Sequence, residues 1–168
     1  MKALEHRNVL TVVDSWVNRS RKEAVYITES FGGWTLRRHL QKLKKYRLRI
    51  VKGWALQILT ALDYLHSKGI VHRSVRCDNI YIDTITNDIK LGEVGLALGN
   101  YYNVHPHFGR PEWAAPENFE DLWTSSGDIY SFGMTLLEIV TGRNPYSECA
   151  NYLQLYRKIY HCGRPQAI

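Results

Sequence analysis

The segments IVHRSVRCDNIYI, residues 70–82, and IKLGEVGLA, residues 89–97, decide the fold of this chain. Residues 80–82 and 89–91 are short pieces rich in β-branched side chains, and the polar sequence between them is turn-like. Two such pieces joined by a turn predict a β-hairpin. The charged and polar sequence HRSVRCDN, residues 72–79, is therefore expected in a loop directly before this hairpin.

Helices are predicted on both sides of this loop and hairpin. Apolar residues recur at spacings of three and four through residues 51–66, which predicts an amphipathic helix. The sequence DIYSFGMTLLEIVT, residues 128–141, is apolar on nearly every side and predicts a central helix that Gly142 and Pro145 end. The stripe of the first helix consists of Val51, Trp54, Ile58, Leu62 and Leu65.

A second hairpin is expected near the start of the chain. Residues 9–16 and 24–28 are rich in β-forming side chains, and the polar sequence NRSRKE, residues 18–23, joins them. Strands followed by helices, with a small hairpin between helical segments, give an α+β fold class dominated by helix. A length of 168 residues, with 45% hydrophobic and 23% charged residues, fits one globular domain or part of one.

The cysteines and the apolar runs bear on the compartment. Cys77, Cys149 and Cys162 are odd in number and irregular in spacing, which fits neither a disulfide framework nor a paired zinc motif. No signal peptide is visible, and no run approaches the roughly 18 apolar residues that a membrane span needs. We therefore expect reduced thiols in a cytoplasmic protein without a membrane span.

The net charge of +6 is local. The run from Arg37 to Lys52 carries +8, so the rest of the chain carries −2. Such a run most simply forms a solvated face of a helix and loop, with an acidic protein, an acidic lipid surface or RNA as the alternative partners. No nucleic acid partner is expected. The basic residues of the run are Arg37, Arg38, Lys42, Lys44, Lys45, Arg47, Arg49 and Lys52.

The order of motifs resembles the protein kinases. HR followed by DN, a strand pair and a Gly-flanked acidic residue is similar to the catalytic loop and metal-binding loop of that family. GRPEWAAPENFE, residues 109–120, is similar to the end of an activation segment, and residues 128–142 to the central helix. The details CDN, GLA and NPYSEC resemble the with-no-lysine (WNK) branch. The resemblance covers essentially the whole chain.

This resemblance implies a protein-kinase-like fold, mainly the helical C-terminal lobe with a remnant of the N-terminal lobe. Residues 1–28 are expected to be remnant strands of the N-terminal lobe. Residues 29–33 correspond to the hinge between the lobes. Residues 34–168 correspond to the C-terminal lobe through the region after the central helix.

Kinase chemistry needs a loop carboxylate to accept the substrate hydroxyl proton, and an asparagine and a second carboxylate to hold magnesium. By the resemblance, Ser74 stands at the catalytic aspartate position, Glu93 at the metal-binding aspartate position, and Asn79 at the second metal ligand. A serine hydroxyl is a poor base near pH 7, and loss of general-base assistance costs about 10²- to 10⁴-fold in rate. Glu93 displaces its charge by one methylene from the geometry that magnesium prefers. Asn79 has a second interpretation, as a loop asparagine that bonds local backbone.

Other family positions also differ. Arg76 replaces the catalytic-loop lysine, and Arg110 replaces a threonine that bonds the same cluster. No serine or threonine occurs between Glu93 and Pro116, so activation by phosphorylation of either residue type in that segment is excluded by composition. The resemblance assigns structural support of the site to His72, Arg73, Asp128 and Glu117.

Of the segments that bind the nucleotide in protein kinases, the resemblance identifies the hinge in this chain. The family's glycine-rich loop and phosphate-binding lysine have no counterpart before Leu4, as we align the motifs. Thr28 resembles the gatekeeper, and Glu29 to Gly32 follow it, with backbone groups expected to face an adenine. ATP and magnesium are therefore the cofactors that the resemblance implies, and we expect this partial pocket to bind ATP weakly.

Three functions stay open at this point. Ser74, Arg110 and the activation segment favour a catalytically impaired WNK-like pseudokinase that acts in intracellular signalling through protein contacts. The second is a weakly active kinase that phosphorylates serine and threonine of proteins. The third is a truncated gene product without function. Protein partners or substrates are expected in the first two cases.

Overall fold

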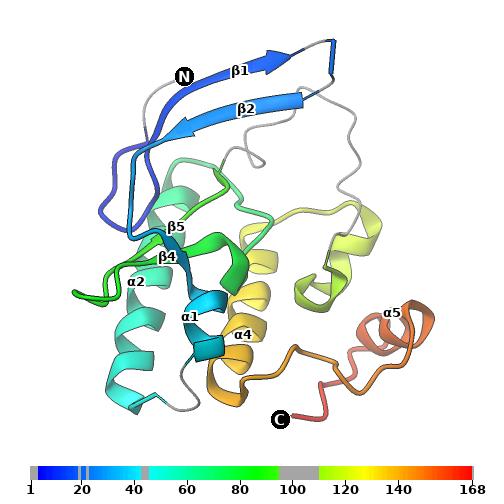
Figure 1. Cartoon of the computed structure of the whole chain (residues 1–168). Coiled ribbons are helices and arrows are strands. Elements are labelled where there is room, and N and C mark those ends of the chain that lie inside the picture. The colour runs from blue at the N-terminus through cyan, green and yellow to red at the C-terminus, as the bar shows by residue number, and fades with distance from the viewer. Residues whose placement is uncertain (1–3, 19, 22, 43–45, 95–109, 168) are drawn as a thin grey trace.

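The computed structural model describes residues 4–18, 20–21, 23–42, 46–94 and 110–167. Figure 1 shows the β1–β2 hairpin at one end, with α1, α2 and α4 below it and α5 to one side. The expected α+β class is confirmed. The helices are α1 (Leu36–Lys42), α2 (Leu48–Ser67), α4 (Ser125–Thr141) and α5 (Tyr152–Tyr160). The strands are β1 (Val12–Asn18), β2 (Glu23–Thr28), β3 (Trp34–Thr35), β4 (Ile80–Ile82) and β5 (Ile89–Leu91), and the 3₁₀ helices are η1 (Cys77–Asn79), η2 (Pro111–Trp113) and η3 (Pro116–Glu120).

The first predicted hairpin is confirmed, but its first strand begins later than predicted. β1 and β2 pair antiparallel, and the residues before β1 pair elsewhere: Val9 bridges Leu91 of β5, and Leu10 N donates to Leu91 O at 2.9 Å. Val9 is fully buried in the main core, whereas Val13 of β1 is exposed. Burial of Val9 and Leu10 therefore decides where the hairpin can begin.

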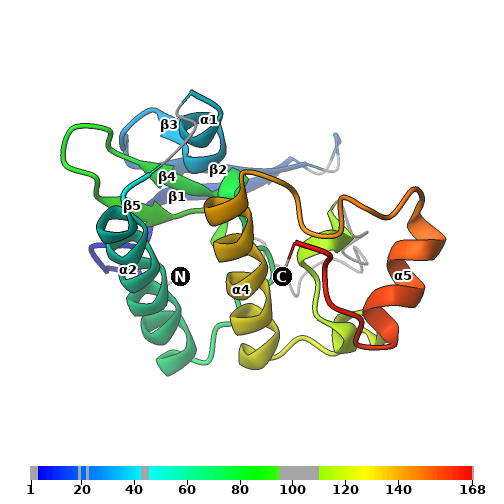
Figure 2. The ribbon, with the colours of Figure 1, turned by 90° about the horizontal axis from the view of Figure 1, so that it is seen from below.

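Helix α2 carries the predicted stripe into the main core. Val51, Trp54, Ile58, Leu62 and Leu65 are all buried, at 7% exposure or less. Burial of one such side chain contributes roughly 1.5–3 kcal/mol, so this stripe is a principal source of stability. The helix is longer than predicted at both ends. In Figure 2 it lies beside α4, and the two helices are in contact.

The second predicted hairpin, β4–β5, is confirmed, and β3 adds a third strand that the sequence did not predict. β3 pairs antiparallel with β4 through Trp34 and Ile82. The chain reaches β3 through Gly32, which has φ +59° and whose added Cβ would lie 2.2 Å from Ile82 O. Only glycine fits this approach, which fixes the segment after β2 against the β4–β5 hairpin.

Helix α4 joins the two hydrophobic clusters of the described residues. It begins at Ser125, where the Thr124 side chain accepts a hydrogen bond from Gly127 N at 3.1 Å, and it ends at Gly142, as predicted. Its buried residues include Ile139 in the main core and Met134 in a second cluster beside α5.

Helix α4 is central, since it contributes to both hydrophobic clusters, but two of its apolar residues are exposed in the described part of the chain. Ile129 is 47% exposed and Val140 is 66% exposed. Helix α2 and the 3₁₀ helices η1 and η2 contact α4. No helix among the described residues is long and apolar enough to cross a membrane.

Candidate functional site

Asp128, in the first turn of α4, holds the loop that precedes η1. Its carboxylate is almost completely buried, at 1% exposure. Oδ2 accepts from His72 N and Oδ1 from Arg73 N, both at 2.8 Å. His66 Nε2, at the end of α2, lies 2.7 Å from Oδ2. The helix N-terminus also favours this negative charge. One carboxylate thus connects α2, α4 and the loop.

His72 fixes the loop from the opposite side. The buried imidazole lies 2.7 Å, through Nε2, from Gly92 O, and Nδ1 accepts from Ser74 N at 3.2 Å. Because Ser74 N can only donate, Nδ1 is the unprotonated nitrogen and Nε2 carries the proton. Burial lowers the pKa of His72, in keeping with this neutral form. Arg73 follows with φ +67°, a left-handed conformation that the two bonds to Asp128 help to hold.

Ser74 is bonded to Asn79. The buried Asn79 amide donates through Nδ2 to Ser74 O at 2.8 Å and to Ser74 Oγ at 2.6 Å. The 3₁₀ turn η1 makes this closure possible, because Asn79 N donates to Arg76 O at 2.9 Å. The local interpretation of Asn79 therefore describes its amide nitrogen, and the serine hydroxyl is engaged within the loop.

Glu93 lies next to this pair. Gly92 N donates to Asn79 O at 2.8 Å, and an added Cβ at Gly92 would meet the Tyr81 ring at 2.5 Å. Glu93 itself is exposed and has φ +59°, while Val94 after it is buried. The structure therefore brings Ser74, Asn79 and Glu93 to one end of the β4–β5 hairpin. Residues 95–109, which include Tyr101, Tyr102 and Pro106, lie outside the described residues.

A group of charged side chains behind η1 was missed by sequence reasoning. Arg37 of α1 lies 2.6 Å, through Nε, from Asp78 Oδ1, and its Nη1 lies 2.9 Å from Glu138 Oε1. Arg76 Nε lies 3.6 Å from Asp78 Oδ2. We call these four residues the η1 charge cluster. Arg37 was expected on a solvated basic face, and that expectation is wrong for this residue: its side chain is only 18% exposed.

Burial and the charges of the η1 charge cluster shift the pKa values of Glu138 and of the neighbouring Cys77. Burial raises the pKa of the Glu138 carboxyl, and the Arg37 guanidinium opposes that rise. Burial, with the negative charge of Glu138, also raises the pKa of the Cys77 thiol well above its ordinary value. Among the described residues, Asp78 Oδ2 and Glu138 Oε2 are buried without a hydrogen-bond partner. Charge pairing with Arg37 is therefore what compensates these two carboxylates.

The predicted hinge residues occupy the link between β2 and β3. Thr28 ends β2 and is exposed. The Glu29 carboxylate accepts from Thr11 N at 2.8 Å and pairs with Lys90 Nζ at 2.6 Å. Burial opposes the charged form of Glu29, but the hydrogen bonds from Lys90 and Thr11 outweigh it and lower its pKa. Together with Gly32, these contacts tie the link to β5 and β4.

Glu117 and Arg110 lie beyond the loop. Glu117 is partly buried in η3, its backbone O accepts from Leu122 N at 3.2 Å, and it makes no ion pair within the described ranges. Arg110 is exposed, and its guanidinium lies 5.9 Å from the Trp113 ring centroid. The Arg37 guanidinium lies 5.3 Å from the same ring. Arg110 and Arg37 therefore both lie near the Trp113 ring.

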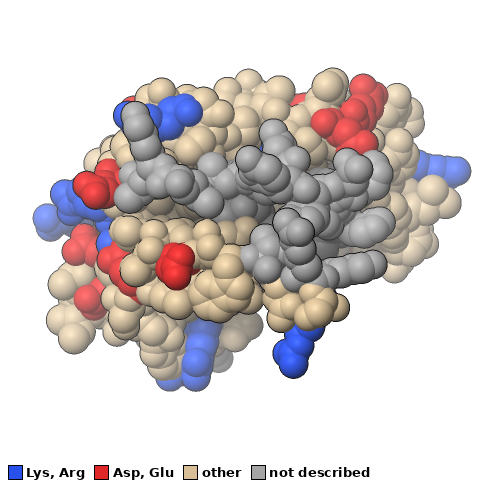
Figure 3. All heavy atoms as spheres, turned by 90° about the horizontal axis from the view of Figure 1, so that it is seen from above, with Lys and Arg blue, Asp and Glu red and all other residues tan. Residues whose placement is uncertain are grey.

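Surface charge is mixed on the face seen in Figure 3. Blue and red side chains lie around its margin among uncharged ones. Of the described residues of the basic run, Arg38, Lys42, Arg47, Arg49 and Lys52 are exposed. Arg38 and Lys42 lie over the Trp34 ring, with the charged group 4.3 and 3.8 Å from its centroid. Within the described ranges, no three histidine, cysteine, aspartate or glutamate side chains are grouped as a metal site.

Comparisons with known proteins agree with this architecture. A family model described as the protein kinase domain matches residues 1–164. The serine/threonine-protein kinase WNK8 of Arabidopsis thaliana is 40% identical over 171 residues, covering 100% of this chain and 30% of that protein. The serine/threonine-protein kinase WNK of Caenorhabditis elegans is 39% identical over 173 residues, covering 99% of this chain and 9% of that protein.

A solved structure gives the same result for the fold. The crystal structure of Rad53 1–466 in complex with AMP-PNP matches with a TM-score of 0.78 and 26% identity, covering 94% of this chain and 40% of that one. The expected protein-kinase-like fold is therefore confirmed. The chain spans less than two fifths of the length of either of these two WNK relatives.

Proposed function

We propose that this chain, which belongs to the protein kinase family and is similar to the WNK serine/threonine kinases, is impaired in phosphoryl transfer and acts through contacts with other proteins. We also propose that it does so in the cytoplasm, in intracellular signalling. The division into remnant strands, hinge and C-terminal lobe stays a prediction.

The hydrogen bond between Asn79 Nδ2 and Ser74 Oγ, at 2.6 Å, is the observation that carries this proposal. Ser74 stands where the family resemblance places the carboxylate base. A neutral hydroxyl that accepts a bond from its neighbour cannot hold the substrate proton as a carboxylate does near pH 7. Loss of this assistance raises the barrier by roughly 3–5 kcal/mol.

Protein kinases use ATP and magnesium, and the described residues fit this pair poorly. Asn79 uses its amide nitrogen on Ser74, which leaves its amide oxygen available to a metal, but Glu93 is exposed and carries one methylene more than the aspartate it replaces. Weak binding or none is therefore expected for the nucleotide with its metal.

The second candidate function is a weakly active serine/threonine kinase. It is favoured by the two hydrogen bonds from His72 N and Arg73 N to Asp128, which keep the catalytic loop ordered although Ser74 has replaced the base. An ordered loop retains positioning, which is a large part of catalysis in phosphoryl transfer.

A thermal-shift titration with ATP and magnesium separates the candidates. We expect no magnesium-dependent rise in Tm for the natural chain. The variant Ser74→Asp with Glu93→Asp, run beside it, tests whether aspartates at both positions are sufficient for binding. A saturable, magnesium-dependent stabilisation of the natural chain would favour the weak kinase instead. A chain that shows no cooperative transition would favour the third alternative, a product without function.

The partner proposed for the exposed part of the basic run is an acidic protein segment. Arg38, Lys42 and Arg49 are exposed and leave α1 and α2 into solvent, whereas Arg37 is engaged with Asp78 and Glu138. Binding through such charges weakens as salt is raised, because exposed charges are screened within about 10 Å at 0.1 M ionic strength.

A further inference from the structure

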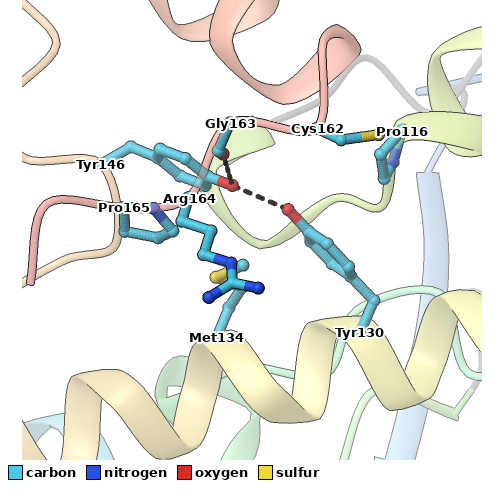
Figure 4. Close-up of a pocket in the computed structure, with 8 residues that line it drawn as sticks. All are labelled: Pro116, Tyr130, Met134, Tyr146, Cys162, Gly163, Arg164 and Pro165. Atoms are coloured by element: carbon cyan, nitrogen blue, oxygen red, sulfur yellow. Dashed lines mark hydrogen bonds between the residues drawn. The ribbon is translucent and has the colours of Figure 1, made fainter. Parts of the chain in front are cut away.

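A cavity of about 420 Å³ opens between α4 and the segment that follows α5. Figure 4 shows Tyr130 and Met134 rising from α4 on one side, and Cys162, Arg164 and Pro165 on the other. Its size falls within the range of pockets that hold small organic molecules. No part of the proposed kinase chemistry uses these residues.

This cavity lies away from the catalytic loop. Asp128 and Tyr130 are two positions apart on α4, so their side chains leave the helix about 200° apart. Asp128 points to the loop, where it bonds His72 and Arg73, and Tyr130 points to the cavity. A ligand here would not occupy the position of a kinase nucleotide or its phosphates.

The cavity wall is apolar and aromatic. Met134 and Tyr146 are buried at 9% and 3% exposure, and Pro165 is buried as well. Tyrosine ring faces and a methionine thioether form favourable contacts with a flat aromatic body. Such a wall favours a ring system over a highly hydrated polar molecule.

The tyrosine hydroxyl protons are already used. Tyr146 Oη donates to Gly163 O at 3.0 Å, so Tyr130 Oη must donate to Tyr146 Oη at 2.9 Å. Burial raises the pKa of both tyrosines, so these hydroxyls stay protonated near pH 7. Neither hydroxyl has a proton left for a ligand.

Arg164 supplies the polar group of the cavity. It is exposed, and Figure 4 shows its guanidinium extending over Met134. Among the described residues, no carboxylate pairs with it and no side chain bonds it. A planar guanidinium without a partner matches a carboxylate, which it can bind with two parallel hydrogen bonds.

We propose that this cavity is a binding site for an aromatic carboxylate, with the ring body between Tyr130, Met134 and Pro165 and the carboxylate on Arg164. The apolar wall would contact the ring of the ligand, and the Arg164 guanidinium would pair with its carboxylate. This inference does not depend on whether the chain transfers phosphate.

The test is a calorimetric titration of the whole chain with 2-naphthoate, and with 2-naphthalenemethanol as the uncharged ligand of the same shape. Arg164→Gln should weaken naphthoate binding about tenfold or more and leave the alcohol unchanged, because a hydrogen bond to a charged group is lost. Arg143→Gln, an exposed arginine outside the cavity, is the matched control and should bind naphthoate as the natural chain does.

Alkylation of Cys162 gives a second readout. This exposed thiol lines the cavity, whereas Cys149 is partly buried elsewhere and Cys77 is fully buried. Saturating naphthoate should slow alkylation of Cys162 several-fold and leave Cys149 unchanged. The proposal is overturned if naphthoate does not bind, if Arg164→Gln binds it as the natural chain does, or if Cys162 is not protected.

The same ligand chemistry occurs in a free aromatic acid and at a peptide C-terminus that ends in an aromatic residue. A Gly-Gly-Trp tripeptide and its C-terminal amide distinguish these sources. Tighter binding of the free-acid tripeptide than of naphthoate assigns the site to a peptide end. Tighter binding of naphthoate assigns it to a small molecule. Either result supports the aromatic carboxylate class, provided that the amide binds more weakly.

Discussion

At the scale of single residues, Asp128 holds the loop that precedes η1, and Ser74, which we propose stands at the position of the catalytic base, accepts a hydrogen bond within that loop. Both positions could be identified from the sequence, because family motifs surround them. The hydrogen bond from Asn79 to Ser74 could not, because it depends on the turn η1 that brings the two side chains together. Arg37 was assigned to solvent with its neighbours, since a run of like charges does not indicate which member turns inward.

Loss of the Asp128 charge should destabilise the whole chain. In Asp128→Asn, one of the two amide protons of His72 and Arg73 would face an NH₂ group in place of an oxygen. A buried donor without a partner costs about 1–3 kcal/mol, and the loss of charge beside His66 adds to this. We expect the free energy of unfolding in urea to fall by about 2–4 kcal/mol. Asp63→Asn, an exposed carboxylate on α2, should change it by no more than about 0.5 kcal/mol.

Removal of the Arg37 charge should make stability more sensitive to alkaline pH. The folded pKa of Glu138 is already raised by burial, and Arg37→Met removes the guanidinium that opposes this rise. A carboxyl whose folded pKa exceeds its unfolded pKa contributes stability at low pH that is lost as the pH rises through the folded value. The variant should therefore lose more stability relative to the natural chain at pH 8 than at pH 5.

Urea unfolding at these two pH values checks this prediction. The loss at pH 8 should be about 3–5 kcal/mol, as for removal of one partner from a buried charge pair. Arg49→Met, an exposed residue of the same basic run, is the control and should show little change at either pH. An Arg37→Met deficit that is equal at both pH values would mean that Glu138 does not titrate as inferred.

At the scale of elements, the long periodic segments were predictable and the short ones were not. The stripe of α2 and the apolar sequence of α4 specify helices by local pattern alone. β3 spans two residues and forms by pairing with β4, so the local sequence carries no strand pattern that predicts it. The exposed face of α4 was also missed, since an apolar sequence indicates what can be buried and not what covers it.

The close approach of Gly32 to β4 gives a test at this scale. Gly32 and Gly33 both have positive φ, but an added Cβ meets Ile82 O at 2.2 Å only at Gly32 and meets nothing within 4 Å at Gly33. Gly33→Ala should cost about 1–2 kcal/mol from the left-handed backbone alone. Gly32→Ala should cost at least 2 kcal/mol more, measured by urea unfolding. Equal losses in the free energy of unfolding for the two variants would contradict this, because they would mean that β4 moves to accommodate the Gly32→Ala methyl group.

At the scale of the whole molecule, the chain has a protein-kinase-like fold in which one helix serves several parts of the structure. Two hydrophobic clusters share α4, and the same helix carries Asp128 to the loop and Tyr130 to the cavity. The fold could be predicted because its motifs follow one another along the sequence. The η1 charge cluster and the cavity could not, because each joins residues from α1, α4 or the end of the chain that lie far apart in sequence.

Phosphoryl transfer itself is the most direct test of impaired catalysis. The measurement is transfer of radiolabelled γ-phosphate from ATP with magnesium to a mixture of serine- and threonine-containing peptides, for the natural chain and for Ser74→Ala. We predict that the natural chain transfers no more phosphate than Ser74→Ala, because the Ser74 hydroxyl does not replace a carboxylate base. Magnesium-dependent transfer by the natural chain that Ser74→Ala abolishes would contradict this.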